Sequence, residues 1–207
     1  MIPEGMKRGS YGLYDRETFI RDQTKRWFTM EHEYAGVAIG LRALVDEWIV
    51  PQFGPDTKIL DVPCGDGVLL KELQARGYRD LTGKELSEKK IAEARKLGIE
   101  ILREDFHNLS NGLYDLVFCT HGLEHAFEPA EVMDGLLRSM SRNAHLVITV
   151  PYPETSGSDA HLAAHEIGID QKDQGATFIA WVKSFGLRCI NTKFADQREA
   201  EIWTMFR

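Results

Sequence analysis

The sequence predicts an α/β protein in which helices cover both faces of an open, mostly parallel sheet. Short apolar runs alternate with amphipathic segments along most of the chain, which is the pattern of repeated strand–helix units. One run, Leu116-Val117-Phe118, is continuously apolar, as expected of a strand buried on both faces. Near the end, two strand-like runs at 187–194 and 200–206 are joined by a polar turn, so we expect them to pair antiparallel.

The predicted elements follow in a regular order from residue 34 onward. Apolar side chains at helical spacing, such as Leu41, Leu44 and Trp48, mark the helices, and prolines or glycines mark where they end. Helices are expected at 34–50, 67–76, 87–98, 129–140 and 176–185. Strands are expected at 58–62, 81–85, 99–102, 114–120, 145–150, 187–194 and 200–206.

Two stretches do not fit this repeat. Residues 1–33 are mixed in charge and rich in aromatic side chains, with a helix expected at 17–28. We expect them to form an N-terminal segment that packs on the sheet edge or acts as a lid, while residues 34–207 form one domain. Residues 152–174 show no clear period and follow a strand end. Because long ordered loops tend to be functional, we expect this stretch to lie over a binding crevice.

The composition favours a compact protein of the cytoplasm. The 207 residues are 43% hydrophobic and 28% charged, with a net charge of −7, which argues against a broad nucleic-acid surface. No apolar run is long enough for a membrane span, and the first residues lack the apolar core of a signal peptide. Cys64 and Cys119 lie in or beside predicted strands and are interpreted as buried thiols. Neither a nucleic acid nor a membrane is therefore an expected partner.

The central feature of the sequence is a glycine-rich turn between a strand and a helix. The strand ends on Asp61, the turn is Pro63-Cys64-Gly65-Asp66-Gly67, and a helical pattern follows. In an open α/β sheet such a turn borders the crevice where ligands bind. The dinucleotide fingerprint G-x-G-x-x-G is not matched, because only two of its glycines are present. The carboxylate of Asp61 would repel a pyrophosphate but could accept a hydrogen bond from an ammonium group.

This pattern, D-x-P-C-G-x-G, resembles motif I of class I S-adenosylmethionine (SAM)-dependent methyltransferases, with Pro63 where that family usually has a glycine. The resemblance implies a Rossmann-like, doubly wound sheet of seven mostly parallel strands with one antiparallel strand near the C-terminus. It also implies SAM as cofactor and S-adenosylhomocysteine as product. The expected cofactor-binding residues lie at four strand ends: Asp61, Pro63, Cys64, Gly65, Asp66, Gly67, Glu85, Leu86, Asp105, Phe106 and Thr120.

The resemblance also implies a role for each strand end. Glu85 would accept hydrogen bonds from the ribose hydroxyls, and Leu86 would flank the adenine. Asp105 would accept from the adenine amino group, and Phe106 would pack on the ring. The backbone at Thr120 would face the methionine end of the cofactor.

The segment after the fourth strand carries the expected chemistry. Leu123-Glu124-His125 resembles the L-E-H segment of many small-molecule methyltransferases. An oxygen or nitrogen acceptor must lose a proton, and histidine is suited to accept one near pH 7. The candidate catalytic residues are His121, His125, His161 and His165, with the first and last preferred.

The expected reaction is methyl transfer to a small-molecule or sugar-linked (glycan) acceptor, with a hydroxyl oxygen preferred. The alternatives are N-methylation of a small molecule, methylation of protein or RNA, and a SAM-binding protein without catalysis.

A metal-dependent hydrolase is a rival interpretation of the same histidines. Residues 121–125 spell H-x-x-E-H, the inverted zinc-protease motif, and His161 and His165 form a second pair beside Glu166. The motif requires both histidines on one helix face, whereas Gly122 would break a helix here. We therefore expect no metal site.

Overall fold

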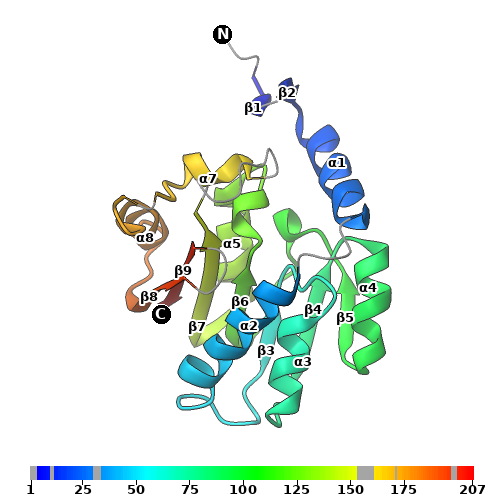
Figure 1. Cartoon of the computed structure of the whole chain (residues 1–207), viewed down its shortest axis with the longest axis vertical. Coiled ribbons are helices and arrows are strands. Elements are labelled where there is room, and N and C mark those ends of the chain that lie inside the picture. Colours follow the sequence, from blue (N-terminus) through cyan, green and yellow to red (C-terminus); the bar gives the residue numbers. More distant parts are fainter. Residues whose placement is uncertain (1–3, 10–11, 30–33, 153–160, 171, 197–199) are drawn as a thin grey trace.

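A seven-stranded sheet forms the centre of the computed structural model, which describes residues 4–9, 12–29, 34–152, 161–170, 172–196 and 200–207 (Figure 1). The strand order is β5-β4-β3-β6-β7-β9-β8. The strands are β3 (Ile59–Asp61), β4 (Leu81–Glu85), β5 (Glu100–Arg103), β6 (Tyr114–Thr120), β7 (Met140–Pro151), β8 (Cys189–Asp196) and β9 (Ala200–Phe206).

The sheet is doubly wound, as the sequence predicts. Strands β3 to β7 are parallel, and β9 is inserted antiparallel between β7 and β8. The winding reverses at β3, which pairs with β4 on one side and with β6 on the other. Ligands of such sheets bind beyond the carboxyl ends of the strands at this reversal point. The topology therefore places the expected ligand-binding crevice at the ends of β3, β4 and β6.

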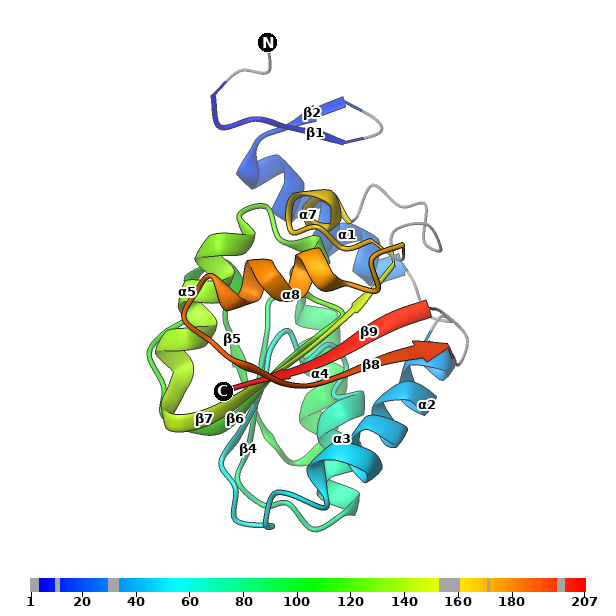
Figure 2. The same ribbon diagram turned by 90° about the vertical axis from the view of Figure 1, so that its left-hand side faces the viewer.

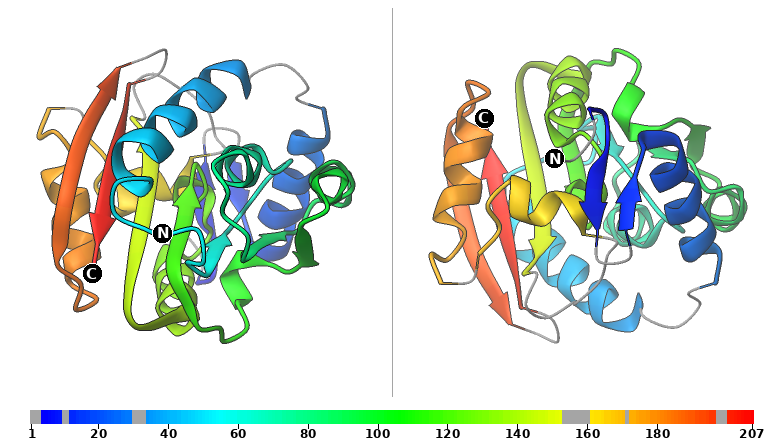
Figure 3. Two further views of the ribbon diagram at one scale, coloured as in Figure 1. Left: turned by 90° about the horizontal axis from the view of Figure 1, so that it is seen from below. Right: turned by 90° about the horizontal axis from the view of Figure 1, so that it is seen from above.

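Helices cover both faces of the sheet (Figure 3). Neighbouring residues of a strand point to opposite faces, so each face has its own core. Ile59 packs into a core with α2, α3 and α4, whereas the next residue, Leu60, packs into a second core with α5 and α8. These helices are α2 (Tyr34–Leu44), α3 (Val68–Ala75), α4 (Glu88–Ala94), α5 (Pro129–Ser139) and α8 (Ala176–Lys183). None of the helices in the described ranges is both long and apolar enough to cross a membrane.

The N-terminal segment lies beside the carboxyl ends of the strands (Figures 1 and 2). It consists of a two-stranded hairpin and a helix: β1 (Lys7–Gly9), β2 (Gly12–Tyr14) and α1 (Arg16–Thr29). Phe19 is 2% exposed, and its ring centroid lies 5.7 Å from that of Phe127, in the segment after β6. Lys7 Nζ lies 2.6 Å from Glu166 Oε2 on a short helix, α7 (Leu162–Glu166).

The structure departs from the predicted elements in a few places. The helix expected at 34–50 ends at Leu44 and continues as a π-helical turn, Val45–Ile49. Strand β7 begins at Met140 rather than at 145, because Met140 pairs with Tyr114 through an irregular register that no apolar alternation marks. The stretch at 152–174, expected to be irregular, contains α7, while residues 153–160 and 171 lie outside the described residues.

Candidate active site

Backbone hydrogen bonds fix the conformation of the turn after β3. The Val62–Pro63 peptide is cis, and the two glycines of the turn, Gly65 and Gly67, have φ of 56° and 85°. Residues other than glycine rarely adopt such angles. The Cys64 N–H donates to the carbonyl of Lys84 at 2.9 Å, and the Gly67 N–H donates to the carbonyl of Cys64 at 3.0 Å. The turn is therefore anchored to β4.

Cys64 and Pro63, both expected to contact the cofactor, have packing roles. A Cβ on Gly83 would lie 2.8 Å from Sγ of Cys64, so the thiol fills the space that Gly83 leaves in the core. Burial raises the pKa of this thiol. The ring of Pro63 packs on Gly122, where an added Cβ would overlap Cδ of the proline. The turn after β3 and the segment after β6 are thus in direct contact.

Glu85 links the turn to the end of β4. Its Oε2 accepts the Gly65 N–H at 2.9 Å, and its Oε1 accepts the N–H groups of Leu86 and Ser87 at 2.8 Å. Ser87 occupies the N-cap position of α4 without a side-chain cap hydrogen bond. A carboxylate oxygen can accept two hydrogen bonds. Oε2 can therefore also accept a hydroxyl of a ligand, in keeping with the expected ribose contact.

Asp61 is a buried carboxyl group at the end of β3, and one of its two oxygens has no partner among the described residues. It is 1% exposed, and no described residue donates a hydrogen bond to its Oδ1. Burial, followed by the charge of Glu85, raises the pKa of Asp61 well above its ordinary value. An unpaired buried carboxylate is costly. A ligand with an ammonium group would fit this position, as SAM requires.

The segment after β5 contains Asp105 and Phe106. Asp105 Oδ1 accepts from the backbone N–H of His107 at 2.9 Å and lies 2.8 Å from its Nδ1. The Phe127 N–H donates to Nε2 of the same imidazole at 2.9 Å, so Nδ1 carries the proton in the neutral ring. Burial alone would raise the pKa of Asp105, but the hydrogen bonds from His107 outweigh it, so the pKa is lowered. Asp105 is therefore oriented and ionised, and its Oδ2 can accept from a ligand amino group.

Lys84, an unexpected charge in a buried strand, has partners of its own. Its Nζ lies 3.1 Å from a carboxylate oxygen of Glu104 and 3.0 Å from Oγ of Ser110. The buried ammonium is thus paired and hydrogen-bonded, as such groups must be.

His121 follows Thr120, the last residue of β6, and has an unusual backbone. Its φ is 49°, a value that non-glycine residues adopt at a cost and that occurs frequently at functional sites. The His121 N–H donates to the carbonyl of Thr149 on β7 at 3.0 Å. Its Nε2 lies 2.7 Å from Oε2 of Glu201 on β9. This backbone conformation therefore directs the imidazole across β7 toward β9.

Glu124 lies beneath the histidines, in a single 3₁₀ turn formed by Leu123–His125. It is 1% exposed, and no described residue donates a hydrogen bond to either carboxylate oxygen. Oε1 lies 3.6 Å from Nε2 of His125 and 4.0 Å from Nδ1 of His121. Burial raises the pKa of Glu124 to about 7, against the opposing charge of His121.

Three of the four candidate histidines gather at this point. The ring centroids of His125 and His161 lie 4.8 Å apart. Burial, followed by the charge of His121, lowers the pKa of His161 to about 4. Ligand atoms of Glu124, His125 and His161 lie within 4.8 Å of one another and could hold a metal ion. His165 belongs to α7, but its side chain is outside the described part of the structure.

The helix that the zinc-protease motif requires does not form at residues 121–125. The segment has one 3₁₀ turn, and Gly122 precedes it with φ −129° and ψ −48°, which is not helical. Glu201, the partner of His121, is not among the residues predicted from the sequence. A carboxylate directly before the apolar Ile202 and Trp203 of a buried strand was the available signal.

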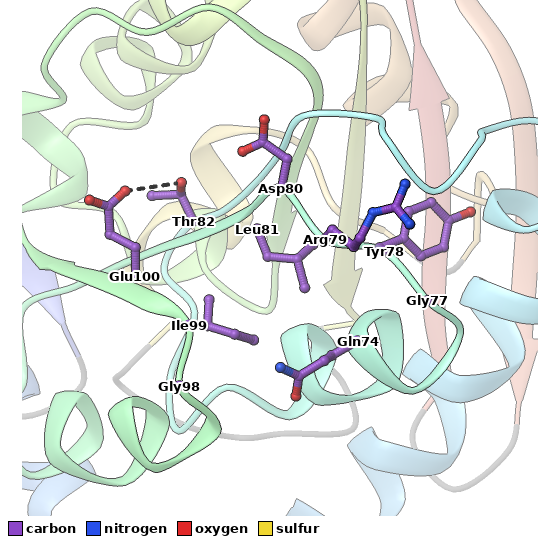
Figure 4. Close-up of a pocket in the computed structure, with 10 residues that line it drawn as sticks. All are labelled: Gln74, Gly77, Tyr78, Arg79, Asp80, Leu81, Thr82, Gly98, Ile99 and Glu100. Atoms are coloured by element: carbon purple, nitrogen blue, oxygen red, sulfur yellow. Dashed lines mark hydrogen bonds between the residues drawn. The ribbon is translucent and has the colours of Figure 1, made fainter.

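A cavity of about 690 Å³ lies away from these residues (Figure 4). It is lined by residues at the starts of β4 and β5, such as Leu81 and Glu100, and by Gln74 and Arg79. It contains none of the predicted site residues. Because strand starts and strand ends lie at opposite edges of a parallel sheet, this cavity is on the far side from the crevice.

The fold, with β9 inserted antiparallel between β7 and β8, is the one expected of a class I SAM-dependent methyltransferase. The family model described as "Methyltransferase domain" matches residues 26–192. The chain therefore belongs to this family, which confirms the predicted family, fold and cofactor.

Relatives and solved structures agree with this assignment. The chain is 33% identical over 119 residues to a ubiquinone biosynthesis O-methyltransferase of Bordetella avium, covering 52% of this chain and 48% of that protein. The enzyme of the same name from Photobacterium profundum is 29% identical over 138 residues, covering 61% and 58%. The chain thus spans about half the length of the curated relatives it matches.

Two solved structures share the fold at low sequence identity. The magnesium protoporphyrin IX methyltransferase of Synechocystis, with bound S-adenosylhomocysteine, superposes with a TM-score of 0.64 at 19% identity, covering 90% of this chain and 93% of that one. A SAM-dependent methyltransferase of Leishmania major gives 0.69 at 13% identity, covering 98% and 96%.

Proposed function

We propose that this protein transfers the methyl group of SAM to a hydroxyl oxygen of a small organic molecule. The observation that carries the proposal is the position of His121. His121 is the first residue after β6, and the contact between Pro63 and Gly122 joins the segment after β6 to the turn after β3. A proton acceptor therefore lies beside the residues expected to hold the cofactor.

The crevice residues divide the binding of SAM among them. Asp61 would accept from its ammonium group, Glu85 from its ribose, and Asp105 from its adenine, with Phe106 against the ring. When bound, SAM supplies a methyl group on a positively charged sulfur, which is an electrophile that needs no metal or further cofactor. The protein has to orient the acceptor for in-line attack and to exclude water.

The proton of the acceptor is the part of the reaction that the protein itself must handle. A phenolic hydroxyl has a pKa of about 10, so a nearby base assists its attack at neutral pH. His121 is half-buried and sits between two carboxylates, Glu201 and Glu124. These carboxylates stabilise the imidazolium that forms when His121 accepts the proton.

The contacts of the N-terminal segment support a small acceptor. Phe19 of α1 packs on Phe127, and Lys7 of β1 is paired with Glu166 of α7. Lys7 also lies 3.5 Å from Glu128. These contacts support the proposal that the described part of residues 1–33 acts as a lid. A lid over the site would favour a small acceptor, and the names of the matched relatives support oxygen as the methylated atom.

The test is turnover of SAM with a panel of acceptors, followed by mass spectrometry of the product. The panel contains a catechol, a simple sugar, a primary amine, a peptide mixture and an RNA. We expect S-adenosylhomocysteine to form with the catechol and the product to gain one methyl group on oxygen. Methylation of the sugar in place of the catechol would make the acceptor a carbohydrate. Methylation of the amine, peptide or RNA would contradict O-methylation of a small molecule. Cofactor binding without turnover of any acceptor would favour a non-catalytic SAM-binding protein.

A further inference from the structure

Strand β7 brings together two residues from the strands on either side of it. The His121 N–H, just beyond β6, donates to the carbonyl of Thr149 on β7. On the other side, Glu201 of β9 is paired in register with Pro151 of β7. The side chains reach across the end of β7, so that Nε2 of His121 lies 2.7 Å from Oε2 of Glu201. This distance is that of a charge-assisted hydrogen bond.

The carboxylate of Glu201 is held from the other side as well. Its Oε1 accepts the indole N–H of Trp203 at 2.5 Å. A Cβ on Gly40 of α2 would lie 3.0 Å from the same oxygen, so the helix backbone limits its movement. Trp203 is buried, and its ring contacts Trp48 edge to face at 5.9 Å between centroids. Glu201 is therefore fixed in place before any ligand binds.

The geometry points to Glu201 as the positioning residue of His121, acting with it as a carboxylate–imidazole pair during methyl transfer. This inference rests on the proposed function. Because Oε2 of Glu201 accepts from Nε2–H, the neutral imidazole keeps its lone pair on Nδ1. As the acceptor oxygen gains the methyl group, its proton passes to Nδ1, and the sulfur keeps the electron pair of the broken bond. Glu201 then stabilises the imidazolium.

Other ionisable groups also face His121. Glu124 lies 4.0 Å from Nδ1, too far for a hydrogen bond, so it acts through its charge. His161 lies before α7 and is near enough for the charge of His121 to lower its pKa. Besides burial, the charge of Glu201 also raises the pKa of Glu124, so Glu201→Gln acts on both groups. Its direct effect on His121 is therefore measured at the Nε2 proton as well as at the titration midpoint.

Two substitutions of glutamate by glutamine form the test. Glu201→Gln keeps an acceptor oxygen but removes the charge. Glu93→Gln is the matched control, because Glu93 of α4 forms an exposed ion pair with Lys96 that has no contact with Glu201 or His121. Circular dichroism and calorimetry with S-adenosylhomocysteine check that each variant is folded and binds the product normally.

The first readout is the titration of the His121 ring by NMR in the full-length protein, with the signal assigned by its loss in His121→Gln. We expect the neutral ring to carry its proton on Nε2. In Glu201→Gln the titration midpoint should fall, because the opposite charge is gone, and in Glu93→Gln it should not move. An unchanged midpoint in Glu201→Gln would overturn the proposal that Glu201 and His121 act as a pair.

The second readout is the rate of transfer to the catechol across pH. In Glu201→Gln we expect kcat to drop about tenfold or more, with the KM for SAM unchanged and the acid limb of the profile moved to lower pH. A lower kcat with an unmoved profile would make Glu201 a structural residue and overturn the inference. If the wild-type protein binds product but methylates nothing, the proposed function fails, and a moved NMR midpoint then describes only a structural contact.

A second variant protects the test against misfolding. Trp203→Phe removes the N–H that Oε1 of Glu201 accepts but leaves the carboxylate and an aromatic ring in place. We expect the His121 titration midpoint and kcat to fall as in Glu201→Gln, but by less.

Stoichiometric metal bound through His121 in the purified wild-type protein would overturn the inference, because a metal would take the lone pair of Nδ1 that is proposed to accept the proton.

Discussion

Pro63 packs against Gly122 so closely that no side chain fits on the glycine. This contact joins the turn that is proposed to hold SAM to the segment that carries His121. The proline, which departs from the family pattern, therefore has a structural explanation: its ring fills the space between the two segments.

Gly122→Ala should separate these segments. The new Cβ would overlap Cδ of Pro63, and overpacking of this kind costs about 1–3 kcal/mol of unfolding free energy. We expect urea denaturation to show this loss and calorimetry to show weaker binding of S-adenosylhomocysteine. Gly54→Ala is the control, since a Cβ there meets nothing within 4 Å. Equal behaviour of the two variants would show that the contact is not needed.

Asp61→Asn should weaken cofactor binding and stabilise the protein without ligand. Burial raises the pKa of Asp61 in the folded state. The stability that this residue contributes is thus full at low pH and is lost as pH rises through the raised pKa. We expect the variant to unfold at a higher temperature than wild type at pH 8 and to bind S-adenosylhomocysteine about 1–3 kcal/mol more weakly. Asp56→Asn, on the surface, is the control; a variant that binds like wild type would remove Asp61 from the site.

Glu124→Gln should have its effect on stability in a defined pH range. Burial raises the pKa of Glu124 to about 7, so wild type should lose stability as pH rises from about 4.5 to above 7. Ionisation of this residue then costs about 3 kcal/mol, which glutamine avoids. Thermal unfolding at pH 5 and pH 8 measures the difference. A variant less stable than wild type at pH 8 would indicate that the carboxylate has a cationic partner.

Lys84→Met should destabilise the protein by about 3 kcal/mol, because Glu104 then loses the ammonium group that it contacts. Adding Glu104→Leu should recover much of this loss, because the pair is then replaced by apolar groups. Urea denaturation of both variants measures the coupling. If the double variant is no more stable than Lys84→Met, the ion pair with Glu104 does not account for the loss of stability on removing Lys84.

Phe19→Ala should release the N-terminal segment without unfolding the sheet. The ring of Phe19 is buried against Phe127, and removing a buried phenylalanine costs about 3–5 kcal/mol. We expect faster dissociation of S-adenosylhomocysteine in stopped-flow measurements and earlier proteolysis within residues 1–33. Leu13→Ala, an exposed position on β2, is the control. Unchanged dissociation would rule out a lid role for this segment.

The sheet and the main helices could be predicted from the sequence because their signals are local. The runs at Leu81–Glu85, Tyr114–Thr120 and Ala200–Phe206 are strands with the predicted bounds. Apolar continuity marks such strands without knowledge of their partners. The hairpin β1–β2 was missed because its strands have only three residues each, too few for a period to show.

The site could be predicted only in part, because its decisive contacts join distant segments. Asp61 and Glu85 lie at strand ends, where a motif can locate them. The role of Glu201 depends on β9 lying beside β7, and no local pattern contains that pairing. The packing of Cys64 on Gly83 likewise requires the parallel pairing of β3 with β4.

Calorimetric titration with S-adenosylhomocysteine, with NAD as the control, tests the central claim most directly. The cofactor site proposed at Asp61, Glu85 and Asp105 predicts one binding site with a dissociation constant in the micromolar range, about −8 kcal/mol, and no heat from NAD. Absence of binding by S-adenosylhomocysteine would contradict the assignment of this crevice as the cofactor site and, with it, the methyl transfer proposed for His121.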